Sequence, residues 1–323
     1  MTETTLYDLI IIGGGPGGLT AGIYAMRAAL KTVVIEKGLA GGQVANSDSV
    51  ENYPGFEYIT GFDLSQKFLQ HAKSYDLEVI QQEVVEIDPG LDHHSVRLAD
   101  GKILSAHALI LAMGGSPLKL GVFGEDKYYG KGVSYCATCD GFFFRNKAVL
   151  VVGGGDTALE EALYLAKLCK HVYVAHRRDA FRGSRILQQR VFGECKIEVL
   201  WSTIVTEIKA NDDGVCAVET KDTQTGEQNE LATDGVFIFI GFSPNNQLVP
   251  AGIPMNASGY VMTDEKCETK IPGIYVIGDL RQKYARQIVI AASDGCTAAL
   301  AAAHYVEEKK AASDTCEMPD FEK

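Results

Sequence analysis

The feature that most constrains this chain is an internal repeat with an offset of 140 residues. The two copies are LYDLIIIGGGPGGLTAGIYAMRAALKTVVIEK at 6–37 and NKAVLVVGGGDTALEEALYLAKLCKHVYVAHR at 146–177. Each copy begins with a short apolar run, Leu9–Ile12 or Val149–Val152, that is typical of a buried strand. A glycine cluster, a helical stretch rich in alanine and leucine, and a β-branched run follow in the same order in both copies. The repeat therefore predicts two βαβ units.

A second pair of matching segments marks where the chain leaves each domain. ALILAMGGSP (108–117) and GVFIFIGFSP (235–244) are apolar strands that end in Gly-x-Ser-Pro. Ahead of each, polar and apolar residues alternate between turn residues, which predicts a small antiparallel meander in both halves. After residue 244 come another apolar strand, 273–279, and an alanine-rich helix from about Ile290 to Glu307, so we expect this segment to return to the first domain. We predict a discontinuous first domain (1–116 and 244–308), an inserted domain (117–243) and a flexible polar tail (309–323).

The two glycine clusters match the fingerprint of dinucleotide-binding folds. Gly13-x-Gly15-x-x-Gly18 and Gly153-x-Gly155-x-x-Ala158 each follow a predicted strand and open a predicted helix. Glycines let the backbone turn tightly and approach a pyrophosphate, and free N–H groups at the helix N-terminus meet the negative charge. The predicted fold class is α/β, with two Rossmann-like, three-layer ββα dinucleotide-binding domains.

The residue at the end of the next strand distinguishes the nucleotides, because it lies beside the adenosine ribose. In the first copy it is Glu36, whose carboxylate can accept hydrogen bonds from both ribose hydroxyls and repels a 2′-phosphate. The second copy has His176, Arg177 and Arg178 there, with Arg182 four residues beyond, and guanidinium groups favour a 2′-phosphate. The alternative for this run is a solvated basic face, since an aspartate lies within it. We predict FAD in the first domain and NADPH in the inserted one.

Two of the eight cysteines are closely spaced, Cys136 and Cys139 in SYCATCDGFFFRN. A lone C-x-x-C pair permits a small-ring disulfide, and Asp140 beside it can donate or accept a proton. A zinc site needs two more ligands, and no second C-x-x-C is present, so we predict no metal. Together with the two predicted dinucleotide sites, the pattern predicts electron transfer from NADPH to the flavin and from the flavin to the disulfide. The resulting dithiol then reduces an outside acceptor by thiol–disulfide exchange.

Charge and hydropathy disfavour several other classes of function. The formal net charge is −12, which argues against sequence-independent binding to nucleic acid or to anionic lipid. The N-terminus lacks the basic residues and apolar stretch of a signal peptide, and no apolar run reaches the ~18 residues of a membrane span. We therefore expect a cytoplasmic protein without nucleic-acid or membrane partners.

Together these motifs resemble the low-molecular-weight, bacterial-type NADPH-dependent thioredoxin reductases over residues 6–306. The resemblance is carried by GGGPGG, GGQ at 41–43, ENYPG at 51–55, CATCDG at 136–141, GGGDTALEEA at 153–162, HRRDAFR at 176–182, and IGD at 277–279 with RQ at 286–287. It implies a homodimer that reduces the disulfide of thioredoxin.

Carried over motif by motif, the resemblance assigns residues to each role. The FAD set is Gly13, Gly15, Pro16, Gly18, Glu36, Gly42, Gln43, Asn52, Asp279, Arg286 and Gln287. The NADPH set is Gly155, Asp156, Thr157, His176, Arg177, Arg178 and Arg182. Cys139 resembles the cysteine that faces the flavin, Cys136 the one that attacks thioredoxin, and Asp140 the acid that protonates a thiolate. The places of Lys131, Phe142 and Phe143 are similar to a thioredoxin-docking surface, with ordinary packing of the two aromatics as the alternative.

Two departures from the family pattern concern the flavin edge. Met113 stands where the family often has threonine, and Ala285 interrupts the commoner Tyr-Arg-Gln order. The alternatives that stay open are an FAD-dependent dithiol oxidase and a ferredoxin-linked thioredoxin reductase, neither of which needs a nucleotide in the inserted domain. A nucleotide-binding redox sensor without turnover is a third. The intact HRRDAFR run argues against the first two.

Overall fold

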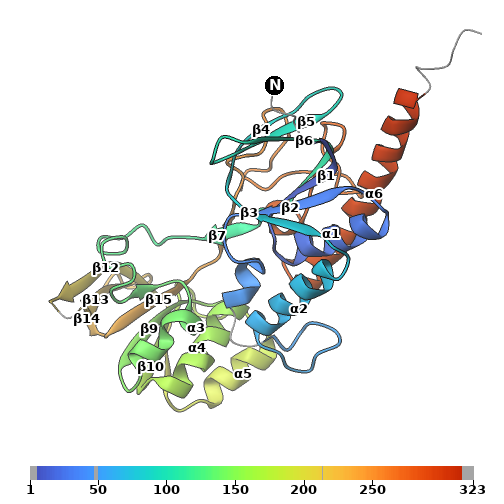
Figure 1. Cartoon of the computed structure of the whole chain (residues 1–323). Coiled ribbons are helices and arrows are strands. Elements are labelled where there is room, and N and C mark those ends of the chain that lie inside the picture. Colours follow the sequence, from blue (N-terminus) through green and yellow to red (C-terminus); the bar gives the residue numbers. More distant parts are fainter. Residues whose placement is uncertain (1–5, 47–49, 213, 315–323) are drawn as a thin grey trace, which may run out of the picture. The chain divides into compact units, whose positions relative to one another are not determined.

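The computed structural model describes residues 6–46, 50–212 and 214–314 (Figure 1). These residues divide into two compact units, one built from residues up to 116 and from 244 onward, and one from residues 117–243. The chain passes between the units twice. The two passing segments, β7 (Gly115–Pro117) and β16 (Phe242–Pro244), pair with each other as a two-stranded sheet.

The discontinuous unit is built on a seven-stranded sheet in the order β3-β2-β1-β6-β5-β4, with β17 beside β6. Parallel pairing joins β1, β2, β3, β6 and β17, whereas β4, β5 and β6 form the antiparallel meander that the sequence predicts. The strands are β1 (Leu6–Ile12), β2 (Thr32–Glu36), β3 (Glu78–Gln81), β4 (Val84–Asp88), β5 (His94–Leu98), β6 (Ile103–Leu111) and β17 (Ile274–Val276).

Both faces of this sheet are buried, which explains why β1 is a continuous apolar run. Leu9 and Ile11 belong to the core formed with helices α1 (Pro16–Arg27) and α6 (Ile288–Asp314), whereas Ile10 and Ile12 belong to the core on the opposite face. Successive side chains of a strand point to opposite faces, so one strand supplies both cores. The unit also contains helix α2 (Gly61–Lys73) and the 3-10 helices η1 (Gly42–Asn46) and η3 (Gly278–Leu280).

Helix α6 corrects the expected C-terminal boundary. The helix continues to Asp314, so the loose tail predicted from Lys309 is wrong for residues 309–314, and residues 315–323 lie outside the described part of the chain. The extension is held to the unit because Lys309 Nζ donates to the Leu91 carbonyl oxygen at 2.9 Å and Lys310 Nζ lies 2.7 Å from Asp8 Oδ1. Two alanines follow these lysines, and alanine has the highest intrinsic helix propensity.

One helix in the described residues, Ile288–Ala312 within α6, is long and apolar enough to cross a membrane by length and composition alone. Its Ala298, Ala302 and Val306 side chains are buried in the core shared with α1. Contact between the two helices is close, because a Cβ added to Gly295 would lie 2.2 Å from the Gly17 carbonyl oxygen. Packing within the unit therefore accounts for the apolar residues on this face of α6.

The inserted unit contains a five-stranded parallel sheet in the order β11-β10-β9-β15-β8 and a three-stranded antiparallel meander, β12-β13-β14. The meander matches the prediction for this half. The strands are β8 (Val133–Ser134), β9 (Ala148–Gly153), β10 (His171–Ala175), β11 (Ile197–Leu200), β12 (Thr203–Asn211), β13 (Gly214–Asp222), β14 (Gln228–Ala232) and β15 (Gly235–Phe239).

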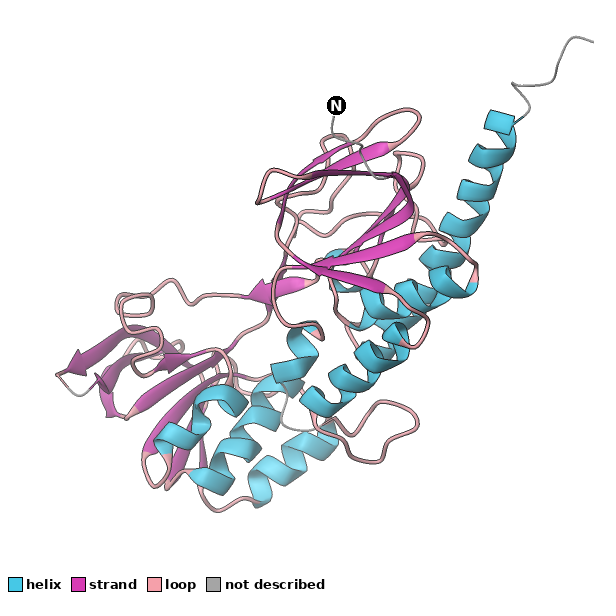
Figure 2. Ribbon diagram, viewed as in Figure 1, coloured by secondary structure: helices cyan, strands magenta, loops and turns pink. Residues whose placement is uncertain are grey.

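The inserted unit has three layers, which are the helices, the parallel sheet and the meander. Helices α4 (Asp156–Leu168) and α5 (Arg185–Gly193) cover one face of the parallel sheet, and the meander covers the other (Figure 2). Between β8 and β9 lie the short helix α3 (Ala137–Asp140) and the 3-10 helix η2 (Gly141–Phe144). The α/β class with parallel sheets is thus confirmed.

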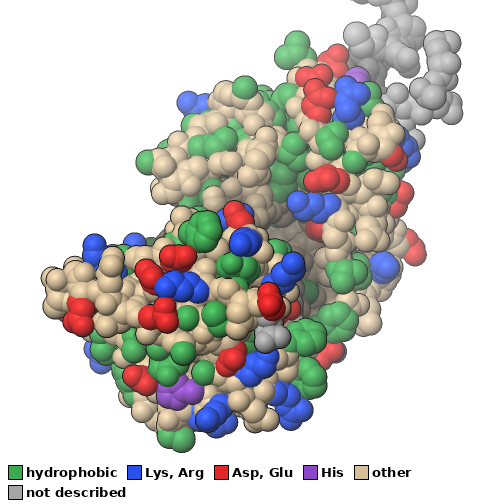
Figure 3. Space-filling model, turned by 90° about the vertical axis from the view of Figure 1, so that its left-hand side faces the viewer, with side chains coloured by type: hydrophobic (Ala, Val, Ile, Leu, Met, Phe, Trp, Pro, Cys, Tyr) green, Lys and Arg blue, Asp and Glu red, His purple; other side chains and the backbone are tan. Residues whose placement is uncertain are grey.

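Acidic and basic side chains are interspersed on the face drawn in Figure 3, where no broad patch of one sign of charge is visible.

Candidate functional site

The first glycine cluster forms the turn between β1 and α1. Gly13 has φ +109°, and a Cβ on it would lie 2.4 Å from the Ala112 carbonyl oxygen. A Cβ on Gly18 would lie 1.9 Å from the Gly13 carbonyl oxygen, so this glycine allows the helix to pack directly on the turn. Gly15 has only the Cα of Gly42 near its missing side chain, at 3.9 Å. Pro16 opens the helix, and no side chain caps its N-terminus. The turn therefore leaves helix N–H groups accessible to an anion.

Glu36 ends β2 beside this turn. Its Oε2 accepts a hydrogen bond from the Gly14 N–H at 2.7 Å, and its Oε1 accepts one from the Gly38 N–H at 2.8 Å. The two backbone donors fix the orientation of the carboxylate and leave further lone pairs on both oxygens. Such an arrangement suits two vicinal hydroxyl donors and opposes a phosphate.

The other residues predicted for FAD come from distant parts of the same unit. Asn52 Nδ2 donates to Gln287 Oε1 at 3.2 Å, which joins positions 235 residues apart. Gln43 Nε2 donates to the Gly115 carbonyl oxygen at 3.3 Å. The guanidinium of Arg286 lies 4.0 Å from the centre of the Tyr260 ring, a cation–π contact.

Asp279 in η3 tests whether this unit fits a flavin. Its Oδ1 is buried and accepts no hydrogen bond from the described residues, and the nearest cation, Lys283 Nζ, lies 4.0 Å away. The Asp279 side chain as a whole is 43% exposed. Burial raises the pKa of this carboxyl, although Lys283 and Arg286 act in the opposite direction. A buried acceptor without a donor is costly, so it points to a ligand that carries hydroxyl or N–H donors, as FAD does.

Sequence reasoning missed the groups that hold η3 in place. Asp294 in α6 accepts hydrogen bonds from Arg281 Nη1 at 2.8 Å, Lys283 Nζ at 2.7 Å and the Gly278 N–H at 3.0 Å. Arg281 Nη1 also lies 3.0 Å from the buried thiol of Cys267, whose pKa burial raises to about 11. The signal in the sequence was one acidic residue, Asp294, among the small residues of the segment Ala-Ala-Ser-Asp-Gly in a predicted helix.

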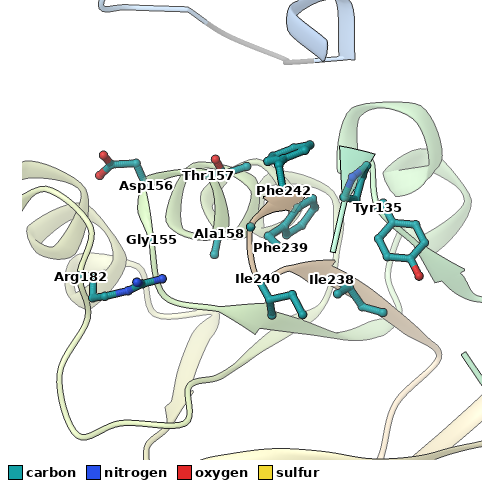
Figure 4. Close-up of a pocket in the computed structure, with 12 residues that line it drawn as sticks. Tyr135, Gly155, Asp156, Thr157, Ala158, Arg182, Ile238, Phe239, Ile240 and Phe242 are labelled. Carbon is teal, nitrogen blue, oxygen red and sulfur yellow. The ribbon is translucent and has the colours of Figure 1, made fainter. Parts of the chain in front are cut away.

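The second glycine cluster lies at the switch point of the parallel sheet of the inserted unit. From β9 the strand order proceeds to β10 and β11 on one side, and to β15 and β8 on the other, which is where ligands bind in doubly wound sheets. A pocket of about 100 Å³ opens there, lined by Pro117, Tyr135, Gly155, Asp156, Thr157, Ala158, Arg182 and residues 238–242 (Figure 4). Nothing lies within 4 Å of the position that a Cβ on Gly155 would take, so this backbone is open to a ligand.

The basic run after β10 is divided by burial. Arg177, Arg178 and Arg182 are exposed, and Arg182 extends beside Gly155 in Figure 4. His176 is buried instead, with its ring against Gly154 and its Nε2 3.1 Å from the Ala180 carbonyl oxygen. Burial lowers the pKa of His176, and Arg182 lowers it further. His176 is therefore neutral at pH 7 and does not add to the cationic group, because it packs inside the loop with Phe181 and Trp201.

Asp156, which is also predicted to bind NADPH, is held by a hydrogen bond from the loop before α5. Its Oδ1 accepts a hydrogen bond from the Ser184 N–H, which ties the start of α4 to the start of α5. Thr157 follows it in the first turn of α4 and lines the same pocket.

Cys136 lies two residues after the end of β8. It is part of a disulfide, and the five cysteines Cys169, Cys195, Cys216, Cys267 and Cys296 are free thiols. Its N–H donates to Ser134 Oγ at 3.0 Å, and its carbonyl oxygen accepts a hydrogen bond from the same hydroxyl at 3.0 Å. The backbone of Cys139 lies in α3, but its side chain is outside the described part of the structure. Asp140 ends this helix and is partly exposed.

The residues predicted for protein docking lie on the surface of the inserted unit. Phe142 is 61% exposed and Phe143 72% exposed, with their rings edge to face at 6.4 Å. Arg145 lies 5.3 Å from the centre of the Phe142 ring. Lys131 is also exposed, in the turn before β8. Both aromatic rings therefore lie on the surface of the inserted unit and not in its core.

Comparison with known proteins agrees with this geometry. Residues 7–295 match the model of the pyridine nucleotide-disulphide oxidoreductase family. The chain is 47% identical to a thioredoxin reductase of Bacillus subtilis over 95% of this chain and 97% of that protein. Its structure is similar to that of Lactococcus lactis thioredoxin reductase, with a TM-score of 0.91 and 42% identity over 94% of this chain and 99% of the other. It is also similar to the structure of T. acidophilum thioredoxin reductase, with a TM-score of 0.89 and 33% identity over 94% of this chain and 99% of the other. The chain therefore belongs to the pyridine nucleotide-disulphide oxidoreductase family, among its thioredoxin reductases.

Proposed function

We propose that this chain is an NADPH-dependent thioredoxin reductase that binds FAD in its discontinuous unit. The observation that carries the proposal is the contrast between two similar turns in one chain. Beside the first turn a carboxylate, Glu36, is fixed by two backbone donors, whereas in the second copy three exposed arginines follow the corresponding strand and one of them, Arg182, lines the pocket at the turn. A disulfide-bonded cysteine follows the same sheet that carries the arginines. The chain thus holds two different nucleotide sites and a redox-active sulfur.

The FAD residues divide the work of holding the cofactor. Helix α1 offers its uncapped N-terminus to the pyrophosphate, and Glu36 accepts hydrogen bonds from the ribose. Asp279 offers its unpartnered buried oxygen to a donor group of the cofactor. When bound, FAD would supply the capacity to accept a hydride and to pass on two electrons. The glycines at 13, 15 and 18 serve by leaving room for close approach.

The sulfur chemistry follows from the disulfide. We assign its partner as Cys139, and two electrons with two protons convert the pair to thiols. The Cys136 thiolate then attacks one sulfur of the thioredoxin disulfide, which forms a mixed disulfide and releases one thioredoxin thiolate. Attack by Cys139 on Cys136 Sγ restores the internal disulfide and releases the second thiolate. Asp140, three residues along α3 from Ala137, would move the proton that this exchange requires.

The three arginines also separate this proposal from its rivals. A dithiol oxidase and a ferredoxin-linked reductase have no use for a 2′-phosphate site, and a sensor does not turn over. We therefore assign NADPH as the electron donor and thioredoxin as the acceptor. The homodimer expected from the resemblance and the cytoplasmic location expected from charge and hydropathy are part of the same proposal.

The test is an anaerobic assay that compares NADPH with NADH as donor and supplies thioredoxin as acceptor. NADPH should be strongly preferred, and Arg177→Gln with Arg178→Gln should reduce that preference about tenfold, since a hydrogen bond to a charged group contributes ~1.5–3 kcal/mol. Lys170→Gln is the matched control, because this exposed cation precedes β10 at the opposite end of the strand. Equal rates with both nucleotides, or no reduction of thioredoxin, would contradict the proposal.

A further inference from the structure

Tyr135 lines the pocket but belongs neither to the glycine fingerprint nor to the arginine run. It directly follows β8 and directly precedes Cys136. Its ring lines the same pocket as Gly155 and Arg182. Figure 4 shows it at the opposite end of the pocket from Arg182, with its hydroxyl turned away from the Gly155 backbone. The pocket therefore receives the face or edge of the ring, while the polar atom points elsewhere.

The hydroxyl is anchored by a buried carboxylate. Tyr135 Oη donates to Glu125 Oε1 at 2.8 Å, and Glu125 is 2% exposed. The same carboxylate accepts hydrogen bonds from the Leu120 N–H at 2.8 Å and the Gly121 N–H at 2.7 Å. Burial and the bond to Glu125 raise the pKa of Tyr135, so the phenol stays protonated and remains a donor. Three charge-assisted hydrogen bonds on one buried group fix the ring more firmly than packing alone.

The loop that carries Glu125 is itself fixed to the meander. The Ile208 N–H donates to the Phe123 carbonyl oxygen at 2.9 Å. Gly124 has φ +93°, and a Cβ there would lie 2.2 Å from the Ile208 carbonyl oxygen, so only glycine permits this approach. The buried carboxylate of Glu125 and the close backbone contact at Gly124 therefore both help to fix the position of the Tyr135 ring.

The strand order says which part of a dinucleotide reaches that ring. The pyrophosphate belongs at the N-terminus of α4, directly after β9, and the arginines that would meet a 2′-phosphate follow β10. The adenosine half therefore lies toward β10, and the other half lies toward β15 and β8. Tyr135 sits at the carboxyl end of β8, beside residues 239–242 at the end of β15.

We infer that Tyr135, held by Glu125, is a positioning residue for the nicotinamide half of the pyridine nucleotide, which its ring contacts next to the redox cysteine. The inference rests on the proposed function, because it takes the pocket to be the NADPH site. It adds a residue that fixes one half of the substrate and does not touch the half that selects for the 2′-phosphate.

Two ligands separate the halves in a binding experiment on the oxidised, FAD-loaded protein. Isothermal titration calorimetry measures the Kd of NADP⁺, which carries both halves, and of adenosine 2′,5′-bisphosphate, which carries only the adenosine half. Tyr135→Ala should weaken NADP⁺ binding about fivefold to tenfold, the usual worth of one aromatic contact. Tyr135→Phe keeps the ring and loses the anchor, so its Kd for NADP⁺ should lie between those of the wild type and Tyr135→Ala. Neither variant should change the Kd of adenosine 2′,5′-bisphosphate, which also reports that the unit is folded.

Phe123→Ala is the matched control, because Phe123 is an exposed aromatic on the Glu125 loop that does not line the pocket. It should bind both ligands as the wild type does. Unchanged NADP⁺ binding by Tyr135→Ala, or an equal loss for both ligands, overturns the inference and leaves the proposed function intact. Failure of the wild type to bind adenosine 2′,5′-bisphosphate overturns the NADPH site itself.

Discussion

The buried ion cluster around Asp294 gives the sharpest prediction about the stability of the discontinuous unit. Asp294 is 7% exposed, and its two oxygens serve Arg281, Lys283 and the Gly278 N–H. The substitution Asp294→Asn keeps the size of the side chain but removes the negative charge and one acceptor oxygen. Lys283, whose side chain is 7% exposed, is then left with Asp279 as its nearest anion, at 4.0 Å.

The expected loss is about 3 kcal/mol, the lower end of the ~3–5 kcal/mol that breaking a buried ion pair costs. The lower end applies because the Arg281 side chain is 17% exposed and Asp279 offers Lys283 a second, more distant partner. For a domain of this size each kcal/mol lowers the midpoint of thermal unfolding by roughly 2–4 °C, so the variant should melt about 6–12 °C below the wild type. Arg281 and Lys283, which follow η3 in the sequence, lose the anion that they share, so η3 with Asp279 should loosen and bound flavin should dissociate faster from the variant.

Thermal unfolding followed by circular dichroism, with release of flavin fluorescence recorded in parallel, measures both effects. Glu86→Gln is the matched control, because it removes the carboxylate of a 2.7 Å pair with Arg97 in the same unit whose side chains are about half exposed. A surface pair of this kind contributes ~0–1 kcal/mol, so this control should melt close to the wild type. If both variants lost the same few degrees, or if Asp294→Asn kept its melting temperature and its flavin, the anchoring role of the cluster would be refuted.

Three further outcomes are expected. Gly153→Ala should destabilise the protein by about 1–3 kcal/mol in urea unfolding, because its Cβ would lie 2.4 Å from the Phe239 carbonyl oxygen, whereas Gly155→Ala should fold normally and bind NADP⁺ more weakly. Burial lowers the pKa of His176, so near pH ~6.5 the unfolded state binds a proton at this residue while the folded state stays unprotonated. The protein therefore loses stability as the pH falls through this range. The melting temperature should therefore fall more between pH 7.5 and 5.5 for the wild type than for His176→Gln, and equal slopes would contradict this. Cys136→Ser should abolish thioredoxin turnover while NADPH still bleaches the flavin absorbance; loss of bound flavin would instead mean that the cysteine is structural.

Much of the fold was open to prediction because the decisive features are local. A glycine cluster between a buried strand and a helix limits the backbone to one kind of turn, whatever surrounds it. The positions of Glu36 and of the arginines follow, since each stands at the end of the strand after its turn. The meanders follow equally from alternation within a few residues.

The sequence by itself therefore determined the class of fold, the two glycine turns and the disulfide-forming cysteine, because these rest on backbone conformation and on spacing along one segment. Tertiary structure alone decided which side chains are buried and with what partners. His176 belongs to a basic run by sequence, but Gly154 and the aromatic rings that pack around it make it a neutral interior residue. Asn52 meets Gln287 across 235 residues, and α6 extends past Lys309 because distant groups bind its lysines. Burial and partnership depend on segments far apart along the chain, and no local pattern encodes which of them will meet.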